Sequence, residues 1–148
     1  MTEKIPQIPP KKSGKIRVLA FGAFDIIHPG HIDFLKNAKK LGDELFIIVG
    51  KDVTIEKHKG KKPSFSEEER RAQVQSLHIA DGVFVGFEDD YLKLPLMISP
   101  DIIALGYDQN APMKLLAEYF PTAKITRLSP HFPEQFKSSK FRSIFPSS

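Results

Sequence analysis

Short runs of apolar residues recur along the chain, separated by longer stretches in which apolar positions recur at helical spacing. The apolar runs consist mainly of Val, Ile, Leu, Phe and Ala and have the length of strands buried on both faces. They lie at 17–21, 44–49, 83–85, 102–105 and 124–128. This alternation predicts one α/β domain with about five parallel strands and helices on both faces of the sheet.

Helical spacing and start signals place the helices between these strands. The predicted helices run over 31–41, 64–77, 88–99 and 113–120. Ser64 with Glu67, and Ser66 with Glu69, both fit a capping box at the start of the second helix. Pro95 interrupts the third helix unless it lies in a first turn.

The stretch 51–64 breaks this pattern, because it is too polar for a core element. It contains five lysines and His58, with Gly60 and Pro63 as helix breakers. We therefore predict a solvated loop here. The loop would leave the carboxyl end of a strand, so one or two of its lysines would overlook any ligand bound at that edge.

Composition limits the size and environment of the protein. A chain of 148 residues has room for one domain with a proper core. The absence of cysteine excludes disulfides and thiolate metal sites. No apolar run is long enough to span a membrane, and the amino terminus lacks the apolar core of a signal peptide. We expect a cytoplasmic protein without membrane contact.

The positive charge is concentrated at the amino terminus. Residues 1–15 carry four lysines against Glu3, which accounts for +3 of the net charge of +4. We predict a flexible basic tail at 1–15, either disordered or laid as a strap across the surface, and one domain at 16–148. The nearly neutral domain is poor evidence for a nucleic-acid surface, so no nucleic-acid partner is expected.

The candidate chemistry lies between the first strand and the first helix, where Gly22-Ala23-Phe24-Asp25 is followed by His28-Pro29-Gly30-His31. The carboxyl end of a strand and the amino end of a helix are where α/β proteins bind phosphate. Two imidazoles can donate ring N–H groups to phosphate oxygens without a strong nucleophile. The alternatives are a surface turn and half of a metal site, but zinc would need further ligands at matching spacing.

These two segments together resemble the signature of the nucleotidyltransferases with an HxGH motif, the cytidylyltransferase-like superfamily, and the resemblance extends over 17–144. It implies a single Rossmann-like three-layer domain with a mostly parallel sheet of about five strands. The implied reaction is attack of an acceptor phosphate on the α-phosphorus of a nucleoside triphosphate, with release of pyrophosphate. Mg²⁺ would accompany the triphosphate, with no metal site formed by the protein itself.

The resemblance also assigns roles to individual residues. The implied catalytic residues are His28, His31, Lys59, Lys62 and Arg70. The implied nucleotide-binding residues are Ala23, Phe24, Asp25, His28, Gly30, His31, Gly106, Asp108, Ser138 and Ser139. Lys59 and Lys62 are alternatives for one phosphate-facing lysine.

Several of these residues also have structural interpretations. Arg70 would either contact phosphate or, like Arg71, pair with Glu67 at helical spacing. Asp25 would orient the triphosphate site or cap its loop, and Asp108 fits a helix cap as well as a nucleotide contact.

The stretch 136–142 resembles the closing motif of the family, in which Ser138 or Ser139 would cap a last helix whose N–H groups can hold phosphate. The sequence departs from the family by lacking the Arg and Gly that commonly precede the hydroxyls of this motif. Lys137, Lys140 and Arg142 are possible substitutes.

The stretch 105–109 is similar to the archaeal FAD synthetase branch of the superfamily, which implies FMN as acceptor and ATP as donor. Phe24, Phe65 or Tyr107 would supply an apolar slot for the flavin ring. Members of that branch often carry cysteines near the carboxyl terminus, and this chain has none. The alternatives are a CTP-dependent enzyme acting on glycerol 3-phosphate or another small polar phosphate, and an adenylyltransferase for a sugar phosphate.

Two expectations concern association and class. The resembled families are commonly dimeric, so a homodimer with a contact near 80–82 is expected. A protein of another class, a non-catalytic binder of nucleotides or nucleic acid that uses the basic tail, is the remaining alternative. Removal of 1–15 would abolish salt-dependent binding by such a protein but would leave an enzyme's turnover intact.

Overall fold

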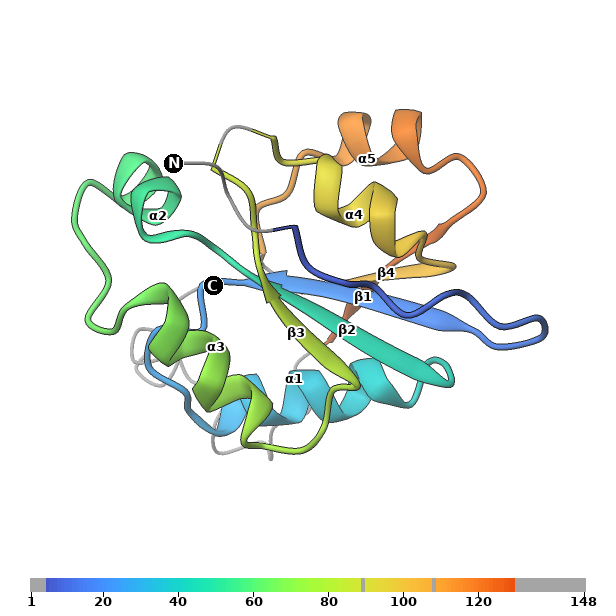
Figure 1. Cartoon of the computed structure of the whole chain (residues 1–148), viewed down its shortest axis with the longest axis horizontal. Helices are drawn as coiled ribbons and strands as arrows, with labels where there is room; N and C mark the ends of the chain where they lie inside the picture. Colours follow the sequence, from blue (N-terminus) through green and yellow to red (C-terminus); the bar gives the residue numbers. More distant parts are fainter. Residues whose placement is uncertain (1–4, 89, 108, 130–148) are drawn as a thin grey trace.

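A five-stranded parallel sheet forms the centre of the chain, in the order β3-β2-β1-β4-β5 (Figure 1). The computed structural model describes residues 5–88, 90–107 and 109–129. The strands are β1 (Arg17–Gly22), β2 (Glu44–Val49), β3 (Gly82–Val85), β4 (Ile102–Gly106) and β5 (Lys124–Leu128). The predicted parallel sheet of five strands is therefore confirmed.

Helices cover both faces of this sheet (Figure 1). One face carries α1 (Pro29–Lys39) and α3 (Glu67–Gln75), and the other carries α4 (Lys93–Ile98) and α5 (Met113–Tyr119). Alternate residues of β1 divide between the two cores, because successive side chains of a strand point to opposite faces. Val18 packs in the core with α1 and α3, whereas Leu19 packs in the core with α4 and α5. The three-layer Rossmann-like fold is as predicted.

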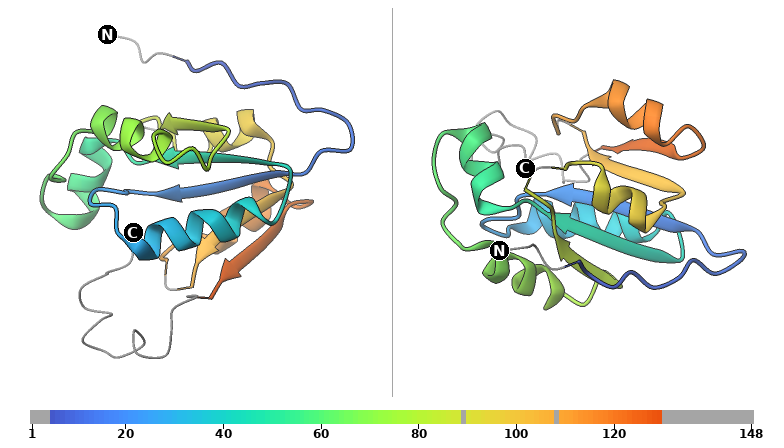
Figure 2. Two further views of the ribbon diagram at one scale, coloured as in Figure 1. Left: turned by 90° about the horizontal axis from the view of Figure 1, so that it is seen from below. Right: turned by 45° about the horizontal axis from the view of Figure 1, so that its top comes forward.

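The prediction of a loop over 51–64 was wrong in its first half, because α2 (Asp52–Lys59) forms there, beyond the ends of the strands (Figure 2). Only Ile55 of this helix is buried. A residue far away in the sequence stabilises its first turn: Glu67 accepts a hydrogen bond from the backbone N–H of Asp52 at 2.9 Å. Gly60, with φ of 77°, ends the helix in the left-handed conformation that glycine adopts without strain.

Local signals set the boundaries of the neighbouring helices. The capping box of Ser66 and Glu69 forms at the start of α3, whereas the backbone N–H of Ser64 donates to Asp25. Pro95 lies in the first turn of α4, where a missing N–H is tolerated, and the helix is shorter than the predicted 88–99. No helix within the described ranges is long and apolar enough to cross a bilayer.

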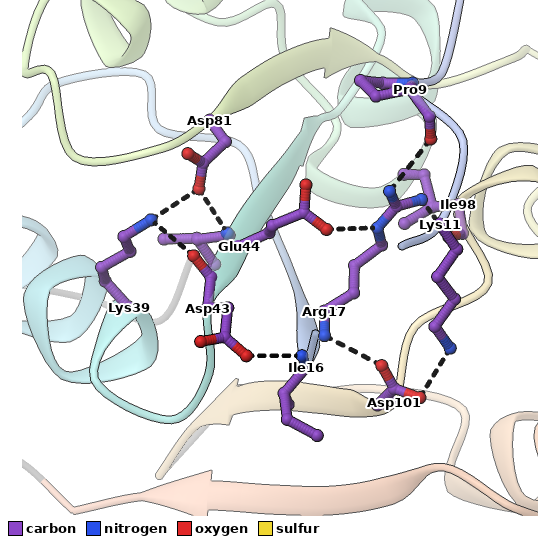
Figure 3. Close-up of polar contacts among 11 residues, drawn as sticks. Pro9, Lys11, Ile16, Arg17, Lys39, Asp43, Glu44, Asp81, Ile98 and Asp101 are labelled. Atoms are coloured by element: carbon purple, nitrogen blue, oxygen red, sulfur yellow. Dashed lines mark hydrogen bonds and ion pairs between the residues drawn. The ribbon is translucent and has the colours of Figure 1, made fainter. Parts of the chain in front are cut away.

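Three aspartates secure the amino ends of the central strands (Figure 3). Asp43, Asp81 and Asp101 accept hydrogen bonds from the backbone N–H groups of Ile16, Leu45 and Arg17 at 2.7–2.9 Å. Partial burial acts to raise the pKa of Asp81 and of Asp101. Hydrogen bonds from lysine ammonium and backbone N–H groups outweigh this effect, so both pKa values are lowered.

Arg17 fastens the amino-terminal segment to the domain (Figure 3). Its side chain is 1% exposed and donates to the carbonyls of Pro9 and Ile98, each at 2.9 Å, and to Glu44 at 3.2 Å. Lys11 forms an ion pair with Asp101 at 2.6 Å. Within the region expected to be a tail, Pro9 and Lys11 therefore contact the domain.

Candidate active site

The loop after β1 begins with a tight turn built on Gly22 and Phe24. Phe24 has a φ of 49°, in the left-handed region that non-glycine residues rarely adopt, and its side chain is 1% exposed. A Cβ on Gly22 would lie 2.6 Å from the Phe24 ring, so the absence of a side chain at Gly22 lets this ring pack inward. Phe24 belongs to the core with α1 and α3, so of the three candidates for the apolar flavin slot the suggestion of Phe24 was wrong.

His28 caps the amino end of α1. Its Nδ1 accepts a hydrogen bond from the backbone N–H of Gly30 at 3.1 Å. An Nδ1 that accepts is not protonated, so the neutral ring carries its proton on Nε2. Pro29 occupies the first helical position, where its missing N–H costs nothing.

The two imidazoles of the motif stack on each other. The ring centroids of His28 and His31 are 3.8 Å apart, and the edge of Phe24 packs against His31 at 5.4 Å. Burial lowers the pKa of His28. Burial, the charge of His28 and the charge of Lys59 lower the pKa of His31 to about 4, against a hydrogen bond to the Ile26 backbone that acts to raise it. Both rings are therefore neutral near pH 7.

Asp25 ties the histidine loop to the segment before α3. Its two carboxylate oxygens accept hydrogen bonds from the backbone N–H groups of Ser64 and Phe65 at 2.7 and 2.8 Å. Of its two predicted interpretations, the loop cap is the one formed in the structure.

Arg70 braces the same loop from within the protein. Its side chain is 0% exposed and donates to the carbonyls of Ala23 at 2.8 Å and Phe65 at 3.0 Å, and to the carboxylate of Asp52 at 2.7 Å. The structure shows neither Arg70 nor Arg71 paired with Glu67. Arg71 pairs with Glu68 instead. The direct contact with phosphate stays a prediction, and the observed bonds make Arg70 a positioning residue.

A cleft of about 780 Å³ opens at the carboxyl edge of the sheet. Phe21 from the end of β1, Phe87 and Tyr91 supply aromatic walls. The cleft is also lined by Lys51, His58 and Lys59, by the turn at Gly22 and Ala23, and by Ile48, Asp90 and Leu94. Of the predicted site residues, Ala23 and Lys59 line this cleft, whereas Lys62, His28 and His31 are not among its lining residues.

Gln109, which the sequence analysis left without a role, joins the ends of two strands at this edge. Its side-chain amide donates to the carbonyl of Phe21 at 3.0 Å and accepts from the N–H of Gly106 at 3.0 Å. Arg127 on β5 donates to the carbonyls of Gly106 and Gln109 at 2.9 and 2.7 Å. In the sequence, the only indication of this role was an amide side chain four residues after the predicted strand at 102–105. Asp108, Ser138 and Ser139 lie outside the described residues.

Replacement of His31 by Asn tests the burial of its imidazole. A folded pKa near 4 and an unfolded pKa near 6.5 mean that the unfolded state binds more protons between these values. The free energy of unfolding therefore falls as pH drops from 7 to 5. We expect this fall to be about 1–2 kcal/mol smaller in His31→Asn, measured by urea denaturation at both pH values. An equal fall in the two proteins would contradict the low pKa.

Replacement of Arg70 by Lys separates bracing from phosphate binding. A single lysine ammonium cannot reproduce the planar guanidinium, which donates hydrogen bonds to three acceptors at once. We expect Arg70→Lys to lower the free energy of unfolding by about 2–4 kcal/mol. The matched control Arg71→Lys, on the exposed side of α3, should cost no more than about 0.5 kcal/mol. Unchanged stability with a raised KM for nucleoside triphosphate would instead favour direct contact with phosphate.

Residues 19–144 match the sequence model of the cytidylyltransferase-like family. The FAD synthase of Thermoplasma volcanium is 42% identical over 131 residues, which cover 86% of this chain and 92% of the relative. The FAD synthase of Thermococcus sibiricus is 43% identical over 129 residues, 86% of each chain.

Solved structures also resemble this one, among them one from Thermoplasma volcanium and one from Francisella tularensis. A crystal structure described as the lipopolysaccharide core biosynthesis protein from Thermoplasma volcanium has a TM-score of 0.74 and 43% identity, and covers 80% of this chain and 100% of the other. The pantoate-beta-alanine ligase of Francisella tularensis, with a TM-score of 0.59, 13% identity and coverage of 84% and 62%, shares the fold alone. The histidine loop, the parallel sheet and the match over most of the chain agree: this chain belongs to the cytidylyltransferase-like family of nucleotidyltransferases.

Proposed function

We propose that this protein transfers AMP from ATP to FMN, forming FAD and releasing pyrophosphate. The observation that carries the proposal is the stacked, neutral pair His28 and His31 at the amino end of α1, in a loop whose residue Ala23 also lines the cleft. The two archaeal relatives named FAD synthase, which match most of the chain, support FMN as the acceptor.

The reaction requires alignment more than covalent chemistry. An oxygen of the FMN phosphate attacks the α-phosphorus of ATP, one P–O bond forms, and the bond to pyrophosphate breaks. The residues that would stabilise the growing negative charge are His28, through its Nε2–H, His31, and the amino end of α1. Neutral imidazoles suit this role, because each one still carries an N–H group that can donate a hydrogen bond to a phosphate oxygen.

Lys59 is the better of the two lysine candidates. It lines the cleft, and its positive charge contributes to the lowered pKa of His31, which places Lys59 within electrostatic range of the histidine pair. A single ammonium in this position would hold a phosphate oxygen as a point charge. The remaining nucleotide contacts that we propose are Ala23, Phe24, Asp25, Gly30 and Gly106, with Asp108, Ser138 and Ser139.

A divalent cation fits this site as a companion of the triphosphate. The described part of the chain contains no group of three or more His, Asp or Glu side chains that could hold a metal ion. Both carboxylate oxygens of Asp25 already accept backbone hydrogen bonds. Phosphate oxygens and water would therefore supply most ligands of Mg²⁺, which would neutralise charge on the leaving pyrophosphate. A homodimer with its contact near 80–82 stays part of this proposal.

The proposed reaction is tested by pyrophosphate release from the purified protein with Mg²⁺. ATP or CTP is combined with FMN, glycerol 3-phosphate or a sugar phosphate, and the nucleotide products are identified by mass. We expect release only with ATP and FMN, together with FAD. Release with CTP and a polar phosphate would keep the mechanism and replace the substrate, whereas no release with any pair would favour a binding function.

Replacement of His28 by Ala tests its catalytic role. The expected result is a loss of at least tenfold in kcat, which corresponds to about 1.4 kcal/mol of transition-state stabilisation. The control is His78→Asn, because His78 lies in the turn after α3 with a φ of 57° that Asn tolerates. The control should keep its rate within about twofold. A His28→Ala protein that retains more than a tenth of the activity would exclude this role.

A further inference from the structure

The cleft contains an aromatic wall whose role the transfer reaction leaves undefined. The rings of Phe21 and Tyr91 lie nearly parallel, with their centroids 5.6 Å apart and an angle of 18° between their planes. Phe21 is the second-last residue of β1 and is 9% exposed, whereas Tyr91 precedes α4 and is 46% exposed. The β-sheet thus fixes the inner ring, and the outer ring remains accessible.

The neighbours of these two rings make the wall apolar. Ile48 from the end of β2 and Leu94 from α4 line the same cleft, and Phe87 adds a third aromatic side chain. A large, planar and mostly apolar group matches this surface better than a small polar phosphate does.

The aromatic wall and the histidine pair lie on different faces of the sheet. Phe21 packs with the core of α4 and α5, whereas Phe24, which contacts His31, packs with the core of α1. Gly22 and Ala23 connect the two sides and line the cleft. Lys59 also lines the cleft and acts electrostatically on His31. An acceptor with a ring at one end and a phosphate at the other can therefore contact both sides of this turn.

We propose that Phe21 and Tyr91 bind the isoalloxazine ring of the acceptor and select flavin phosphates over small polar phosphates. This inference rests on the proposed FMN adenylyl transfer and assigns its specificity to named side chains. The exposed face of the Tyr91 ring is available for stacking on the flavin. The Phe21 ring stacks on Tyr91 and keeps it in this orientation. The phosphate end of the acceptor then points past Ala23 toward Lys59 and the histidine pair.

The test compares Tyr91→Ala with Tyr91→Phe and with Tyr119→Ala. Tyr119 is a matched control, because it is 48% exposed and lies on α5 outside the cleft lining. With the other substrate saturating in each case, we expect Tyr91→Ala to raise the KM for FMN about tenfold while the KM for ATP stays within about twofold. Tyr91→Phe keeps the ring and should resemble the unmodified protein, as should Tyr119→Ala.

Flavin fluorescence gives a second readout that does not depend on turnover. Stacking on an aromatic side chain quenches FMN emission, so titration of FMN with the unmodified protein should lower it, and Tyr91→Ala should shift the midpoint about tenfold. If the unmodified protein forms FAD but Tyr91→Ala has the same KM and the same titration midpoint, the aromatic wall is excluded while the transfer reaction stands. If the unmodified protein neither forms FAD nor quenches FMN, the transfer proposal fails and this inference fails with it.

Discussion

The guanidinium of Arg70 holds the candidate active site together, because three separate segments meet on it. Its hydrogen bonds reach the carbonyl of Ala23 in the histidine loop, the carbonyl of Phe65 before α3, and the carboxylate of Asp52 at the start of α2. Asp25 adds a second connection between the first two of these segments. The loop that carries the histidines and the helix that carries Lys59 are therefore positioned by one buried cation.

The histidine pair could be located from the sequence because its surroundings are encoded locally. An apolar strand before it and helical spacing after it suffice to place His28 and His31 at a strand-to-helix junction. The helix α2 could not be located in this way, since its first turn depends on Glu67 and Arg70, which are 15 and 18 residues away from Asp52. The suggestion that the Phe24 ring lines the flavin slot failed for a related reason: only the left-handed turn directs this ring into the core.

Charge and hydrogen bonding are separated in this site. Near pH 7 the two imidazoles are neutral, because burial keeps their pKa values below the ordinary range. They are hydrogen-bond donors, and the positive charge around the cleft comes from Lys51 and Lys59. A hydrogen-bond donor that carries no charge can be enclosed at low cost, whereas the ammonium groups need contact with water. This difference explains why His31 packs against Phe24 while Lys59 stays exposed.

The strand order determines when each part of the sheet can assemble during synthesis on the ribosome. On one side β1 pairs with β2, which follows it in the chain after the single helix α1. On the other side β1 pairs with β4, which begins about 85 residues after the start of β1. Until β4 emerges, the nascent half of the sheet presents one long edge of β1 with its peptide groups hydrated. The side chain of Arg17 also awaits the carbonyl of Ile98, and its backbone N–H awaits the carboxylate of Asp101, so both contacts form only when the segment that leads into β4 has been made.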